Sequence, residues 1–201
     1  MISIDDVNYY TEHGIIVHPL TRPILGNKST GKAPILKEWE ARTEPYDEND
    51  FKKWLKEGCN IGANCGKVSN LTVIDIDYYI KGIWDYVFSG IDTSNFVIQS
   101  RTERDGKKHY LFQYSPALKT CTNHELGFDI RNDSGNIVLA PSEHYEGDVY
   151  KLHAPIENRP ELPEIAAQRI NEIISTYAQL KATLAKCRKP FQKLWKAVFT
   201  D

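Results

Sequence analysis

The sequence changes its pattern at Pro160, and this change constrains the fold more than any other feature. Before Pro160, short apolar stretches alternate with turns rich in Gly, Pro, Asn and Asp, which is typical of strands joined by hairpins. After it, residues 163–186 are rich in Ala, Ile, Leu and Glu, with apolar residues at helical spacing. This order predicts an α+β fold with antiparallel or mixed sheets, followed by a C-terminal helical segment.

Three pairs of strands are expected in the first part of the chain. Each pair consists of two apolar stretches on either side of a short polar turn: 60–66 with 71–77, 95–100 with 109–114, and 128–131 with 136–140. A further strand is expected near residues 14–20, ending close to Pro19. Helices are expected at residues 5–10, 47–58, 80–88, 163–186 and 190–199.

Length and charge restrict the class of protein. The chain has 201 residues and a formal net charge of -2, which suits a globular domain with an ordinary core and argues against coating nucleic acid by bulk charge. No signal peptide or membrane span is visible, so we expect a cytoplasmic protein without a membrane partner. Six basic residues lie between Lys181 and Lys196, which indicates a solvated helical face, a nucleic-acid contact or a link to a further domain.

The four cysteines point away from disulfides. Cys59, Cys65, Cys121 and Cys187 include no Cys-x-x-Cys pair, and such spacing is typical of reduced intracellular thiols. A zinc site could combine Cys121 and His124 with Cys59 or Cys65, but it would need ligands that are distant in the sequence. Zinc is therefore not the metal we expect.

Asp75 and Asp77 form the strongest local motif. They alternate with apolar residues in Val73-Ile74-Asp75-Ile76-Asp77, and side chains in a strand alternate between its two faces. The isoleucines are therefore expected in a core, with both carboxylates on the opposite face. Two adjacent carboxylates repel unless a cation lies between them, and such oxygen ligands suit Mg²⁺ or Mn²⁺. The alternative is a strand end that exposes two acids to water, and Asp-x-Asp also occurs in glycosyltransferases, phosphatases and nucleases.

Further candidates lie on later strands. His109 follows two lysines, and the polar run 99–102, which includes Ser100 and Arg101, is expected on the strand beside it. Cationic and hydroxyl side chains around a histidine supply the donors that a triphosphate needs. Asp129, flanked by apolar residues, could supply a third metal ligand. Taken alone, His109 and Asp129 are each also compatible with an ordinary structural residue.

The order of these motifs is more specific than any one of them. An Asp-x-Asp strand is followed 32 residues later by a strand histidine, and after 20 more by the apolar-flanked aspartate. In this order the chain resembles the archaeo-eukaryotic primase superfamily, specifically the bifunctional primase–polymerase (prim-pol) domain of plasmids, viruses and some CRISPR-associated proteins. The resemblance covers about residues 9–152. It also rests on Gly31-Lys32-Ala33-Pro34 with Trp39, on residues 60–66 and on residues 135–142.

The resemblance implies a prim-pol fold at residues 1–160, with an RRM-like palm sheet, and a helical appendage at residues 161–201. It also implies a role for each candidate side chain. Asp75, Asp77 and Asp129 would hold two Mg²⁺ or Mn²⁺ ions, His109 would contact the phosphates of an incoming NTP or dNTP, and Lys32, Ser100 and Arg101 would be further nucleotide contacts. Two departures are visible. The first motif is Asp-x-Asp where many prim-pols have Asp-x-Glu, and an obvious zinc-binding stem is missing.

The implied activity is that of a DNA primase/polymerase. It would perform template-directed, two-metal nucleotidyl transfer, including primer synthesis on single-stranded DNA in replication. The implied partners are a single-stranded template, a primer, nucleotides and a fused or associated helicase. Two other interpretations stay open: a metal-dependent nuclease, which could use the same carboxylates, and a non-catalytic RRM-like nucleic-acid-binding module. The module would need aromatic residues on the sheet face where this sequence places carboxylates and a histidine.

Overall fold

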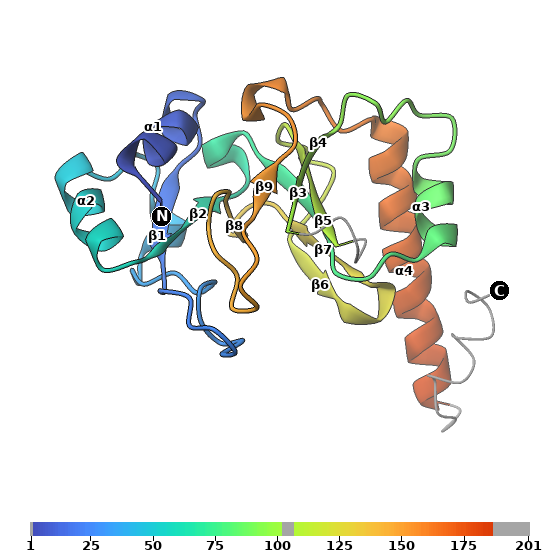
Figure 1. The fold of residues 1–201 in the computed structure, drawn as a ribbon. Helices are drawn as coiled ribbons and strands as arrows, with labels where there is room; N and C mark the ends of the chain where they lie inside the picture. The colour runs from blue at the N-terminus through green and yellow to red at the C-terminus, as the bar shows by residue number, and fades with distance from the viewer. Residues whose placement is uncertain (1, 102–106, 187–201) are drawn as a thin grey trace.

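The strands form two sheets in the computed structural model, which describes residues 2–101 and 107–186. All strand pairs are antiparallel, so the predicted α+β class is confirmed (Figure 1). The smaller sheet contains, in spatial order, β1 (Val17–Leu20), β2 (Asn60–Asn64) and β8 (Asn136–Val138). The larger sheet contains, in spatial order, β6 (Cys121–Asn123), β7 (Phe128–Arg131), β3 (Thr72–Ile76), β5 (Lys108–Phe112), β4 (Val97–Ser100) and β9 (Lys151–Leu152).

Four α-helices lie in the described part of the chain: α1 (Ile4–Glu12), α2 (Glu48–Lys56), α3 (Lys81–Val87) and α4 (Glu164–Lys186). Short 3₁₀ turns occupy Trp39–Ala41, Lys67–Ser69, His124–Leu126 and Ile156–Asn158. Helix α1 begins with a capping box, because Ser3 Oγ accepts from the Asp6 N–H and the Asp6 carboxylate accepts from the Ser3 N–H. Figure 1 places α1 and α2 beside the smaller sheet and α3 and α4 against the larger one.

The larger sheet is packed on both of its faces. One face contributes Ile74, Ile76 and Phe128 to a core shared with α3 and α4, including Trp84 and Ile170. The other face packs on the smaller sheet and on α1 and α2, in a second core. That core includes Val73, Val97 and Leu111 from the larger sheet and Ile61, Ala63 and Ile137 from the smaller one. Alternation along β3 therefore sends successive residues into different cores, as the strand period requires.

Two of the three predicted hairpins are wrong. Strands β2 and β3 lie in different sheets and are joined only by the isolated bridge between Gly66 and Leu71, and β7 and β8 also lie in different sheets. Two apolar strands separated by a short turn can pair edge to edge or enter facing sheets, and both arrangements bury the same residues. The predicted pair at 95–100 and 109–114 is confirmed, since β4 and β5 pair antiparallel.

One further predicted strand and four of the five predicted helices lie within the described residues. The strand expected to end near Pro19 continues to Leu20, and it lies at the edge of its sheet, where the missing N–H of proline is tolerated. Helices α1, α2, α3 and α4 lie where helices were expected, and residues 190–199 are outside the described residues. The first half of α4 packs into a core through Ala166 and Ala167, and the division of the chain at residue 160 stays a prediction. No described helix has the length and apolar character needed to cross a membrane.

Candidate active site

Four polar side chains form one row across the larger sheet. The register pairs Asp129 with Asp75, Asp75 with His109, and His109 with Gln99, across β7, β3, β5 and β4. Residues directly opposite each other in antiparallel strands project from the same face. The alternation that buries Ile74 therefore gathers a carboxylate pair, a histidine and an amide on the opposite face.

A cavity of about 440 Å³ lies over this row. All seven predicted site residues line it: Lys32, Asp75, Asp77, Ser100, Arg101, His109 and Asp129. Other lining residues come from the loop around Trp39, from Lys107 and Lys108, from Asn136–Val138, and from Tyr150. The cavity thus lies where the smaller sheet and its neighbouring loops border the exposed end of β3.

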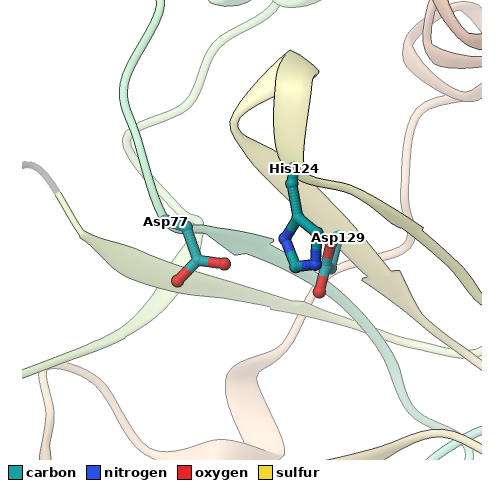
Figure 2. A group of neighbouring side chains, drawn as sticks. All are labelled: Asp77, His124 and Asp129. Carbon is teal, nitrogen blue, oxygen red and sulfur yellow. The ribbon is translucent and has the colours of Figure 1, made fainter.

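Asp77, His124 and Asp129 form a cluster suited to a metal ion. One ligand atom from each lies within 4.8 Å of those from the other two, and Figure 2 shows the three side chains converging. Asp77 directly follows β3, His124 begins the turn before β7, and Asp129 is in β7. Carboxylate oxygens with an imidazole nitrogen are a common donor set for divalent metals. The chemistry of these donors therefore fits a divalent ion.

The backbone around this cluster is held by Gly127. The N–H groups of both Asp77 and Tyr78 donate to the Gly127 carbonyl. Gly127 has φ +74°, and a Cβ there would lie 2.4 Å from the Tyr78 carbonyl oxygen. Only glycine allows the turn that carries His124 to approach the end of β3 so closely.

Electrostatics distinguish the carboxylates of the site. Burial raises the pKa of Asp77, and the negative charges of Asp75 and Asp129 raise it further. A cation in the cluster would oppose this repulsion. Asp129 is buried, and its two oxygens accept hydrogen bonds from the Asn123 N–H at 3.0 Å and from Arg131 Nη2. Arg131 already supplies one positive charge at this end of the cavity.

Asp75 is paired with His109 and is outside the metal cluster. Its Oδ1 lies 3.3 Å from His109 Nε2. Burial would raise the pKa of Asp75, but the His109 imidazole, with help from Arg131 and Lys32, holds that pKa below its usual value. Because Asp75 adjoins Asp129 in the row, its proposed role as a metal ligand stays a prediction.

The other predicted nucleotide contacts, Lys32, Ser100 and Arg101, line the same cavity. The Arg101 side chain is only 12% exposed, and its Nη1 donates to Glu146 Oε2 at 2.6 Å and lies 3.8 Å from Asp148 Oδ2. Burial and the nearby Arg101 lower the pKa of Lys32, against the opposite effect of Asp75 and Asp77. Ser100 Oγ is 2.6 Å from His153 Nε2. The structure thus brings all these residues to one cavity.

His124 is the ligand candidate that sequence reasoning missed. From the sequence, His124 is a candidate only for a zinc site beside Cys121, and Cys121 is not part of the cluster. The available signal was its position in the segment Cys121–Gly127, which leads directly into the strand of Asp129. Trp39, Tyr150 and Arg131 also line the cavity without having been predicted as site residues.

Together, the fold and the site define an α+β domain with a donor set for divalent metal and several cations around one cavity. Residues 7–165 match the protein family described as bifunctional DNA primase/polymerase, N-terminal (Prim-Pol). This match covers most of the chain, so the protein belongs to the Prim-Pol family, whose members are enzymes of the nucleotidyltransferase type. No curated protein matches the chain. The family predicted from the ordered motifs is therefore confirmed.

Proposed function

We propose that this chain is a DNA primase/polymerase that performs template-directed, two-metal nucleotidyl transfer and starts primers on single-stranded DNA. One observation carries the proposal: a single cavity joins the Asp77–His124–Asp129 cluster to His109, Lys32 and Arg101. Transfer of a nucleotide needs carboxylates that bind metal, together with cations and hydrogen-bond donors that bind phosphates. Membership in the Prim-Pol family supports this activity over the nuclease and the non-catalytic module.

The metal-binding residues would be Asp77, Asp129 and His124, with Asp75 beside them. When bound there, divalent ions would lower the pKa of the attacking 3′-hydroxyl and stabilise the leaving pyrophosphate. Asp129 is prepared for this role, because the Asn123 N–H and Arg131 hold both of its oxygens in place. The Asp129 carboxylate is therefore already oriented before an ion binds, and binding does not need to order this side chain.

Lys32, Arg101 and His109 would bind the triphosphate. The Arg101 side chain is only 12% exposed, so it would interact more strongly with a phosphate than an exposed cation, because less water screens it. Arg101 now donates to Glu146, so a phosphate oxygen would replace or join that carboxylate as its acceptor. These contacts would hold the nucleotide and offset the negative charge that develops on the leaving group.

Primer initiation makes a further demand, because two nucleotides must be held without a duplex to anchor them. Lys28 and Lys32 lie in one loop, and Lys32 borders the cavity with its ammonium 5.6 Å from the centre of the Tyr145 ring. We propose that this loop helps to hold the initiating nucleotide or the template. The preference for NTP or dNTP is best decided in the same assay.

The experiment is primer synthesis on unprimed single-stranded DNA, with labelled NTPs or dNTPs and with Mg²⁺ or Mn²⁺. The wild-type chain should make short labelled products, and Asp75→Ala with Asp77→Ala should abolish them. Asp85→Ala, which removes an exposed carboxylate on α3, is the matched control and should retain full synthesis. Undiminished synthesis by the double variant would refute the proposal. Shortening of labelled DNA without any extension would favour the nuclease instead.

A further inference from the structure

Gln99 is fully buried beside His109, and its side chain makes three polar contacts. Its Oε1 accepts from the Ala140 N–H at 2.8 Å, its Nε2 donates to the Val138 carbonyl at 2.7 Å, and the same Nε2 lies 2.9 Å from His109 Nδ1. The amide therefore connects β4 of the larger sheet to the end of β8 in the smaller one. It also faces the nitrogen of His109 that points away from Asp75.

The orientation of this amide is set by backbone groups alone. A backbone N–H can only donate, so Ala140 requires the oxygen of the Gln99 amide. A backbone carbonyl can only accept, so Val138 requires its NH₂ group. Exchanging the oxygen and the nitrogen would break both bonds in a buried position, where unpaired polar groups are costly. The NH₂ group must therefore face His109.

This orientation determines where the imidazole carries its proton. The second N–H of Gln99 Nε2 needs an acceptor, so His109 Nδ1 must present a lone pair. The ring proton is then on Nε2, which lies 3.3 Å from Asp75 Oδ1 and needs a proton to make that contact favourable. Both sides of the ring thus require the same tautomer.

We infer that Gln99 is a positioning residue that holds His109 in its neutral Nε2–H tautomer. A neutral imidazole in this state keeps its single N–H on the nitrogen that faces Asp75 and the cavity, without first gaining a proton. The other tautomer would present a lone pair to Asp75 and to any phosphate oxygen, and both contacts would be repulsive. The tautomer follows from the hydrogen bonds alone, whereas its use for a nucleotide phosphate rests on the proposed function.

The first test measures the tautomer in the whole chain without nucleotide or metal. Long-range ¹H–¹⁵N spectra of imidazole rings distinguish the two neutral tautomers from each other and from imidazolium. The His109 signals are identified by their loss in His109→Ala. At neutral pH the wild type should show protonated Nε2 and bare Nδ1. A proton on Nδ1, in either the other tautomer or imidazolium, would overturn the inference.

Two substitutions of Gln99 should move the spectrum in different ways. Gln99→Met removes the donor, so His109 should populate both tautomers. Gln99→Glu keeps an acceptor for Ala140 and presents another to His109 Nδ1, which should become protonated. Gln113→Met is the matched control, because Gln113 also donates to a backbone carbonyl, that of Arg159, near the end of β5. It should leave the His109 signals unchanged. An unchanged His109 spectrum in a folded Gln99→Met or Gln99→Glu would overturn the inference, and if neither folds, the wild-type spectrum decides.

The second test asks whether the tautomer serves the nucleotide. Gln99→Met should raise the KM for nucleotide about tenfold, which is the effect expected from the loss of roughly one hydrogen bond. The change in kcat should be smaller. In a His109→Ala background, the same substitution should have almost no further effect on KM. Equal effects in both backgrounds would overturn the positioning role. A wild type that uses no nucleotide would refute the proposed function, while the spectrum would still decide the tautomer.

Discussion

Acid should destabilise the fold through His18, and the size of the effect follows from its surroundings. The ring is 1% exposed in β1, and its Nε2 lies 2.7 Å from Asn136 Oδ1. Asn136 donates through Nδ2 to the Lys32 carbonyl, so its oxygen faces the histidine and Nε2 must carry the proton. Nδ1 is buried with no hydrogen-bond partner among the residues that the structure describes. A second proton would therefore enter a buried position with no acceptor for it.

Burial accordingly lowers the pKa of His18 from 6.5 to about 4, against a smaller opposite effect of Asn136. Well above pH 6.5 the ring is mostly neutral in both the folded and the unfolded chain. Below that pH, His18 becomes protonated in the unfolded chain but stays neutral in the folded chain until the pH approaches about 4. Between pH 7 and pH 4.5 this difference should cost the fold about 2.5 kcal/mol of unfolding free energy.

The assay is urea unfolding of the wild type and of His18→Phe at pH 7 and at pH 4.5. His18→Phe cannot titrate, so its loss between the two pH values should be smaller than the wild-type loss by about 2.5 kcal/mol. His144, whose pKa is also lowered to about 4 by burial and by Arg101 and Lys32, continues to titrate in both proteins. Equal acid losses in the two proteins would refute the reasoning. Each variant's own stability at pH 7 is the reference, so a packing defect does not affect the comparison.

Two further predictions concern the metal cluster. His124→Ala should weaken Mn²⁺ binding, measured by electron paramagnetic resonance, by at least about tenfold. His13→Ala, at the C-terminal end of α1, is the control and should leave the affinity unchanged. Equal affinities of wild type and His124→Ala would remove His124 from the ligand set. Gly127→Ala should cost roughly 2 kcal/mol or more in urea unfolding, because a Cβ would lie 2.4 Å from the Tyr78 carbonyl oxygen. Gly90→Ala is its control, since Gly90 has a similar φ of +75° but nothing within 4 Å of the added Cβ. Only the cost of backbone strain should lower its stability. The same loss at both glycines would show that the close approach of the turn to β3 contributes nothing.

The face that carries the site could be predicted from the sequence because a strand has a period of two. Alternation in β3 was enough to place Asp75 on the face opposite the apolar Ile74. The pairing of β3 with β5, which brings His109 beside Asp75, was not predicted, because these strands are not neighbours in the sequence. Sheet membership could not be predicted in the same way. The residues of β2 and β3 are apolar enough to be buried in either arrangement, and only tertiary packing decides that they face each other.

The position of His124 also depends on information that spacing does not carry. Its side chain reaches Asp77 because the turn at 124–127 ends in a left-handed glycine that accepts two hydrogen bonds from the end of β3. A turn of this kind is not evident from the residue types alone. The ordered motifs predicted the family because they follow the order of strands, and that order does not require the turn conformation to be known.

The row of Asp129, Asp75, His109 and Gln99 makes the spacing of the site a property of the sheet. Neighbouring strands lie about 4.8 Å apart, so four strands separate the first and last positions by about 14 Å. Loops between these strands can change length without altering that distance. A shift of one residue in any single strand, however, would turn its side chain to the opposite face. Insertions and deletions in these loops should therefore leave the spacing of the row unchanged, whereas a shift within one of its strands should disrupt it.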